Sequence, residues 1–201
     1  MEASKGNRKS FLWRVFFLQS SRNMRIVDGI GFFHAILPLL KGREREQAGP
    51  LDMTKHLGYF NCNPLLAPFV ITHIAEMENR RLEGDSNITD AMISRYKDVL
   101  SSSLTAIGDY FTEMILLPLA LTIGCIFATY YSYFGLVLFL AIYNFYHLRL
   151  RIKSSNFHLD QFRASGREVL FGIVGEERVV ENIASFAFGV FAGVIVLKAF
   201  K

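Results

Sequence analysis

The sequence predicts an all-α, polytopic membrane protein with broken or re-entrant helices and a hairpin of two spans. Residues 114–148 contain no Lys, Arg, Asp or Glu, and their apolar residues follow one another instead of keeping to one helical face. As a single helix this block would be about 52 Å long, whereas the hydrocarbon core of a bilayer is about 30 Å thick. We therefore predict two short spans joined by an uncharged outer turn at residues 130–135, where tyrosines favour the interface.

Basic residues on both sides of this block favour the hairpin. Two crossings place both basic groups in the cytoplasm, as the positive-inside rule expects, whereas one crossing would separate them. The group before the block is Arg80, Arg81, Arg95 and Lys97, and the group after it is Arg149, Arg151, Lys153, Arg163 and Arg167. The net charge of +4 therefore does not indicate a nucleic-acid groove, because such a groove does not alternate with long charge-free blocks.

The start of the chain predicts an amphipathic N-terminal arm, residues 1–22. Its apolar part, residues 11–18, is short for a span and suits a helix in the membrane interface, with Arg14 reaching outward. Residues 24–40 are apolar and charge-poor, and residues 41–56 form the first clear loop. The two cysteines, Cys62 and Cys125, lack neighbours at metal-ligand spacing, so we expect two reduced, buried thiols.

Residues 57–77 are apolar yet contain two prolines and two asparagines, which a plain span avoids. A broken or re-entrant helix tolerates this composition where its backbone lines a cavity or is buried in protein. Asn61 and Asn63 would then cap a half-helix or offer amides to a polar solute. The competing interpretation is an ordinary Asx turn in which Pro64 starts a helix.

Charged residues return after this stretch and again before the long apolar block. Glu78 is a candidate site residue, although a solvated helix end is the alternative interpretation. Thr89 is the expected N-cap of the next helix. Asp109 and Glu113 are four residues apart, so a helix places both carboxylates on one face at the mouth of the apolar block.

We expect one membrane-embedded domain over residues 1–201, with its membrane core at residues 23–148. Residues 149–201 are expected to form a polar segment and a short span, which is charge-free over residues 183–197. Gly189 and Gly193 have the spacing that lets helices approach closely. No cofactor or metal is expected, because the sequence contains no Gly-rich phosphate loop, nucleophile elbow or His-Glu-x-x-His motif.

Several ordered motifs resemble one family. Residues 56–64, HLGYFNCNP, are similar to its motif HLxFFNTxP, and residues 97–109 resemble KxxLMGPLAGxGD. Residues 23–38 are similar to N(Y/F)ERMQxLGF…P, and Pro118 falls where a proline is expected. The family is the IID membrane subunit of the mannose/fructose/sorbose-type phosphotransferase system. The resemblance runs from Phe11 to about Tyr146 and continues more weakly to Val196.

The resemblance implies a multi-pass protein of the bacterial inner membrane. It would pair with a IIC subunit to form the path for a hexose-type sugar, and the IIC–IID pair would form a homo-oligomer. The chain would not be catalytic by itself, because the phosphoryl-carrying histidines belong to the IIA and IIB proteins. The residues implied to lie near the sugar or the IIC interface are Asn61, Asn63, Pro64, Glu78, Lys97, Gly108 and Asp109.

The sequence also departs from the family pattern. The family's Gly-Pro-Leu-Ala-Gly is replaced by residues 102–106, SSLTA, and its Phe-Trp after Gly-Asp is replaced by Thr112 and Glu113. The chain is also shorter than the family pattern implies. These departures motivate an alternative, a regulatory or scaffold paralogue that does not transport sugar. An unrelated membrane enzyme using Asp109 and Glu113 is disfavoured, because no nucleophile or metal set accompanies them.

Overall fold

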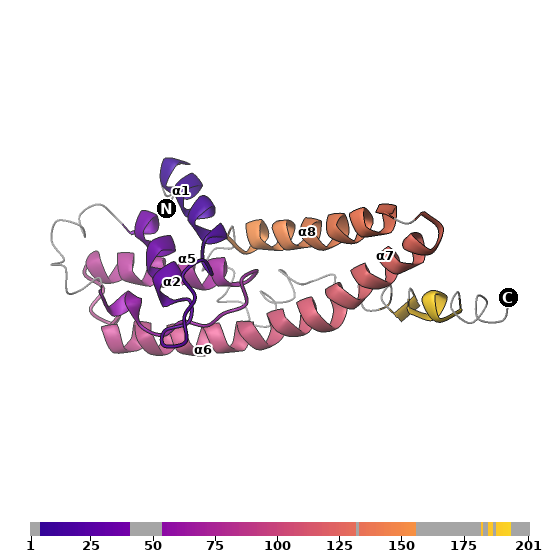
Figure 1. The fold of residues 1–201 in the computed structure, drawn as a ribbon. Helices are drawn as coiled ribbons and strands as arrows, with labels where there is room; N and C mark the ends of the chain where they lie inside the picture. The colour runs from indigo at the N-terminus through magenta and orange to yellow at the C-terminus, as the bar shows by residue number, and fades with distance from the viewer. Residues whose placement is uncertain are drawn as a thin grey trace. The chain divides into compact units, whose positions relative to one another are not determined.

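The computed structural model describes residues 5–40, 54–131, 133–155, 182, 185–186 and 188–193. These residues are mainly helical, and the β pairing among them is limited to two isolated bridges. The chain divides into two compact units, Met1–Ala106 with Arg151–Arg163, and Ile107–Leu150 with Ala164–Lys201. Figure 1 shows the helices in chain order. The all-α prediction is confirmed, whereas the single domain over residues 1–201 stays a prediction.

The first unit begins with α1 (Lys5–Phe16), which packs through one face. Phe11, Val15 and Leu18 are fully buried at a spacing close to one helical turn, whereas Trp13 is exposed. Arg14 does not reach outward as we predicted, because its Nη1 donates a hydrogen bond to the carbonyl oxygen of His34, 2.9 Å away. That carbonyl belongs to the last turn of α2, where a cation is favourable.

The second helix, α2 (Gly29–Ile36), packs backbone to backbone against two loops and continues as the 3₁₀ turn η1 (Leu37–Leu39). A Cβ on Gly31 would overlap the carbonyl of Leu18, and a Cβ on Gly29 would overlap the carbonyl of Gly58. The missing side chains therefore allow this close approach. It fixes the start of α2 against the loop that follows the short helix η2 (Lys55–Leu57).

Irregular backbone separates η2 from α5 (Ala67–Leu82), and a broken or re-entrant helix at membrane depth stays a prediction for this stretch. Asn63 Oδ1 accepts a hydrogen bond from the Leu65 N–H at 3.0 Å, and its carbonyl accepts from the N–H groups of Leu66 and Ala67. This is the Asx turn that we had set against the half-helix cap. It leads directly into the first turn of α5.

The last helix of the first unit, α6 (Asp90–Asp109), begins as the sequence predicts. Thr89 Oγ1 accepts a hydrogen bond from the Met92 N–H at 3.2 Å, which is the N-cap geometry. The unit boundary falls within this helix, after Ala106.

In the second unit the chain continues as the π-helix η3 (Tyr110–Leu116) and then α7 (Leu117–Tyr131). The Leu117 N–H bonds to the Thr112 carbonyl, five residues back, and the Thr112 hydroxyl donates to the Gly108 carbonyl at 2.8 Å. Pro118 has no N–H and crowds the carbonyl four residues before it. Both features disturb the regular α-helical ladder here.

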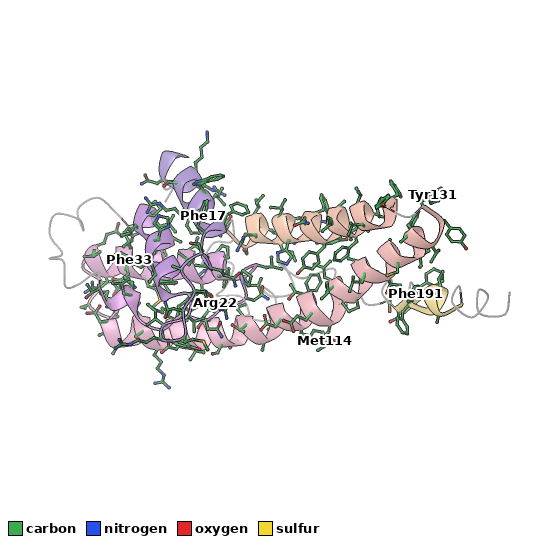
Figure 2. All side chains as sticks on the ribbon, viewed as in Figure 1. Phe17, Arg22, Phe33, Met114, Tyr131 and Phe191 are labelled. Atoms are coloured by element: carbon green, nitrogen blue, oxygen red, sulfur yellow. The ribbon has the colours of Figure 1, made fainter. Side chains whose placement is uncertain are left out.

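A hairpin forms between α7 and α8 (Tyr133–Ser155), as Figure 1 shows. A Cβ on Gly135 would overlap the carbonyl of Gly124 and the backbone nitrogen of Ala128, so small residues allow the two helices to approach closely. Tyr131 lies at the end of α7 (Figure 2).

Two stretches are long and apolar enough to cross a membrane, Asp90–Tyr131 and Tyr133–Ser155. They confirm the predicted two-span hairpin. One detail of the prediction was wrong, because Cys125 is exposed and only Cys62 is buried. The short span predicted at residues 183–197 lies partly outside the described residues. Gly189 and Gly193 are described, and neither has an atom within 4 Å of an added Cβ.

Candidate functional site

The most concentrated polar group in the first unit surrounds Glu78, near the end of α5. Its side chain is only 3% exposed, and the side chains of Lys55, His56 and Arg81 contact it. Oε1 lies 2.8 Å from Lys55 Nζ and 3.1 Å from His56 Nε2, while Oε2 accepts a hydrogen bond from Arg81 Nε at 3.2 Å. The contact of Lys55 with Oε1 is an ion pair, and the contact of Arg81 with Oε2 is an ion pair that includes a hydrogen bond.

Asp90 extends this cluster to the first residue of α6. Lys55 Nζ donates to Asp90 Oδ1 at 2.6 Å, and Arg81 Nη1 lies 3.6 Å from the same oxygen. Lys55 and Arg81 therefore each bridge two carboxylates. The resulting ion-pair cluster (Lys55, His56, Glu78, Arg81 and Asp90) joins η2, α5 and α6.

Electrostatics keep Glu78 ionised despite its burial. Burial acts to raise its pKa, but His56 and Lys55 outweigh this and hold the pKa at about 2, below the ordinary 4.5. Burial likewise acts to lower the pKa of Lys55, and its contacts with Asp90 and Glu78 raise it overall. Glu78 is thus a buried structural anion, and the solvated helix end that we had considered is wrong.

Three of the predicted site residues lie in the loop between η2 and α5. Asn61 is half-buried, its Oδ1 accepts a long 3.5 Å hydrogen bond from Arg22 Nη2, and its carbonyl accepts from Thr105 Oγ1 at 3.3 Å. Asn63 is buried in its Asx turn. The Pro64 carbonyl accepts a hydrogen bond from Arg151 Nε at 3.1 Å. Of the two asparagines, Asn61 is the one that is partly exposed, and its amide oxygen faces Arg22.

Lys97 lies beside this loop, against the aromatic pair Phe32 and Phe60. The residue is 6% exposed, and its Nζ lies 4.6 Å from the Phe32 ring centroid and 5.9 Å from that of Phe60. Within residues 5–40, 54–131 and 133–155, Lys97 forms no ion pair with a carboxylate. Its charge is stabilised by aromatic faces instead.

Asp28 is a buried acid that sequence reasoning missed. It is 0% exposed, neither carboxyl oxygen accepts a hydrogen bond, and the nearest cation is Arg22 Nη1 at 3.7 Å. Burial raises its pKa, against the lowering effect of Arg22. A single Asp in an apolar, glycine-containing segment gives no local pattern that separates it from a helix N-cap, and its side chain makes no capping bond.

Gly108 and Asp109 belong to the second unit, where α6 gives way to η3. Gly108 is buried and its carbonyl accepts the Thr112 hydroxyl, while Asp109 is half-buried and Glu113 is exposed. The structure therefore gathers Asn61, Asn63, Pro64, Glu78 and Lys97 in the first unit and leaves Gly108 and Asp109 in the second. In the described part of the chain, no group of three His, Cys, Asp or Glu side chains is arranged to hold a metal ion.

A family model decides what these motifs belong to. The IID component of the mannose/fructose/sorbose family of the phosphotransferase system matches residues 2–165. The chain belongs to this IID family. The match includes all seven predicted site residues, as well as the ion-pair cluster and Asp28.

Individual IID proteins are similar to this chain at lower identity. The sorbose-specific IID component of Klebsiella pneumoniae is 29% identical over 74% of this chain and 54% of its own length. The mannose-specific IID component of Escherichia coli K12 is 26% identical over 69% of this chain and 49% of its own length. The chain thus spans about half the length of the curated relatives that it matches.

Solved structures show the same fold. A chain of the mannose transporter ManYZ in complex with microcin E492 is 21% identical, with a TM-score of 0.70 over 94% of this chain and 70% of that one. A second solved membrane protein gives a TM-score of 0.73 at 20% identity, over 97% of this chain and 71% of that one. The fold is therefore that of IID-type membrane proteins, as the motifs implied.

Proposed function

We propose that this IID protein is a membrane subunit of a sugar phosphotransferase permease. Together with a IIC subunit it forms the translocation path for a hexose-type sugar. The observation that carries the proposal is the family match over residues 2–165. The names of the similar relatives, sorbose-specific and mannose-specific, support a hexose-type substrate.

The partners and location follow from the same proposal. The protein resides in the bacterial inner membrane as a multi-pass subunit, receives IIA and IIB phosphocarrier proteins, and assembles as a homo-oligomer of the IIC–IID pair. Two apolar stretches long enough to span a bilayer support this location. The phosphoryl group is carried by histidines of IIA and IIB, so this chain contributes binding and not group transfer.

The contacts in the first unit suggest different roles for the predicted residues. Asn61 is a half-buried residue, and its side-chain amide suits hydrogen bonding to a sugar hydroxyl. Asn63 and Pro64 hold the backbone of the same loop through Leu65 and Arg151. Glu78 fixes η2, and Lys97 supports Phe60, the residue before Asn61.

In the second unit we propose that Gly108 and Asp109 act at the substrate path or the IIC interface. They stand immediately before η3. π-Helical turns of this kind are frequent at functional sites. Asp109 is half-buried at the start of a long apolar stretch. An acidic side chain is energetically unfavourable within a membrane segment, and residues of this kind usually mark functional sites.

Deleting the chain's gene and restoring it tests the proposal. We expect deletion to abolish uptake of at least one of mannose, fructose and sorbose, and restoration with the neighbouring IIC gene to recover it. The tagged chain should co-purify with that IIC subunit in detergent. A Glu76→Gln variant, altered at a partly exposed α5 ion pair with Arg80, should restore uptake fully. Unchanged uptake and phosphorylation after deletion would instead support the non-transporting paralogue.

A further inference from the structure

The turn before α2 combines two unfavourable features in adjacent residues. Val27 has φ +52°, and it is the one non-glycine residue with positive φ in the described part of the chain. A β-branched residue in this region is strained. Asp28 follows it, fully buried and without a hydrogen bond to either carboxyl oxygen. Strain beside an unsatisfied buried acid calls for a functional explanation.

The backbone of this turn is held against the Asn61 loop. Val27 exchanges hydrogen bonds with Asn23 and lies beside Phe60 in an isolated bridge. The Asp28 N–H donates to the Phe60 carbonyl at 2.9 Å, and the Phe60 N–H donates to the Ile26 carbonyl at 3.2 Å. The strained turn therefore holds Asp28 in a fixed position, because its backbone is hydrogen-bonded to Phe60, the residue before Asn61.

Arg22 connects the two side chains. Its Nη1 lies 3.7 Å from Asp28 Oδ2, and its Nη2 donates to Asn61 Oδ1 at 3.5 Å. The Arg22 side chain is 50% exposed, so water competes for its hydrogen bonds. The ion pair with Asp28 is the contact that holds the guanidinium group in this position. Arg22 lies on the segment between α1 and α2 (Figure 2).

We propose that Asp28 is a positioning residue that acts through Arg22 to orient the Asn61 amide, so that Asn61 Nδ2 donates to a sugar hydroxyl. This inference rests on the proposed function. With Oδ1 turned toward Arg22, the two Nδ2 hydrogens are the donors that Asn61 offers to a ligand. When Asp28 is neutral, Arg22 loses its anchor, and the amide presents oxygen or nitrogen without preference.

Two further side chains near this turn do not replace Arg22. Lys97 and His56 contact the ring of Phe32, at 4.6 Å and 6.0 Å from its centroid, and Phe32 donates its N–H to the Asp28 backbone carbonyl. Burial raises the pKa of Asp28 above its ordinary value, against the effect of Arg22. Mild acid therefore neutralises Asp28 before it neutralises an ordinary aspartate, and Arg22 is released.

The full chain, co-expressed with its IIC, IIA and IIB partners, provides the first test. We expect Asp28→Asn to raise the KM for sugar uptake about 5-fold with little change in the maximal rate, because only ligand orientation is lost. The wild-type KM should rise as pH falls, whereas the KM of Asp28→Asn should not. Arg22→Gln should match Asp28→Asn, and the double variant should be no worse, since both act on Asn61. Asp85→Asn, in an exposed loop, is the matched control.

A second measurement does not depend on transport. A spin label at Tyr59→Cys, an exposed position two residues from Asn61, is placed in a chain carrying Cys125→Ser. The label should become more mobile in Asp28→Asn, and in the parent chain at acid pH. Unchanged mobility overturns the inference, and so does normal wild-type uptake with an unaltered KM and pH profile in Asp28→Asn. Absence of uptake by wild type would contradict the proposed function alone, because the label still reports the loop.

Discussion

The two units use opposite means to fix their backbones. In the first, charged and polar side chains hold irregular backbone, with Lys55, His56 and Arg81 around the buried Glu78 and Asn63 closing the turn before α5. In the second, α7 and α8 meet where side chains are missing, at Gly124 and Gly135. Polar side chains can hold irregular backbone in place, whereas glycine contacts let two apolar helices approach closely without any charged group.

The ion-pair cluster should give the largest effect. Glu78→Gln leaves Lys55, His56 and Arg81 without the buried carboxylate that they share, and we expect it to lower the free energy of unfolding by about 4 kcal/mol. Chemical unfolding in detergent, followed by helical circular dichroism, measures this. The matched control is Glu76→Gln, whose pair with Arg80 is partly exposed and should change stability by less than about 0.5 kcal/mol. Equal effects of the two variants would contradict a buried structural anion.

Acid should weaken the first unit through the same carboxylate. The pKa of Glu78 is about 2 in the folded chain and 4.5 ordinarily, so its stabilisation is present above about 4.5 and is lost as pH falls toward 2. The difference corresponds to about 3 kcal/mol. Thermal midpoints measured between pH 6 and 3 should fall more for wild type than for Glu78→Gln. Parallel curves for the two proteins would assign the acid sensitivity to other groups.

The stability of the α7–α8 hairpin should depend on the size of the side chains where the two helices touch and not on their charge. Gly135→Ala places a Cβ against the Gly124 carbonyl and the Ala128 nitrogen, and overpacking of this kind costs about 2 kcal/mol. Gly189→Ala is the control, because it has no atom within 4 Å of the added Cβ and alanine favours a helix. Cysteine crosslinking between α7 and α8 in membranes measures the separation of the helices. Crosslinking of Gly135→Ala that is as efficient as in wild type would show that the contact at Gly135 does not set the separation of the two helices.

The contrast between the units also explains what the sequence could predict. The hairpin could be predicted because a charge-free block of known length has few solutions in a bilayer, and Thr89 could be placed because N-caps are local. In the cluster around Glu78, Lys55 pairs with Glu78, 23 positions later in the chain, and with Asp90, 35 positions later, and no local pattern pairs them. From the sequence, Glu78 therefore looked like a solvated helix end, and no sequence pattern indicated that Asp28 is buried. Family motifs indicated Asn61 and Lys97, but only the fold shows that Arg22 contacts one and that aromatic rings cover the other.

The smallest effect should come from the turn that carries Asn61. Asn63→Ala removes the acceptor of the Leu65 N–H inside a buried Asx turn, and we expect a loss of about 1 kcal/mol in the free energy of unfolding. Asn87→Ala, in the exposed loop where Asn87 contacts Asp85, should cost less than about 0.5 kcal/mol. Because the Asx turn aims the chain from Asn61 into α5, Asn63→Ala should also raise the KM for sugar, whereas Asn87→Ala should not. If Asn63→Ala lowers stability and leaves KM unchanged, the turn serves the fold of the first unit alone, and the position of Asn61 depends on Arg22 and Thr105 instead.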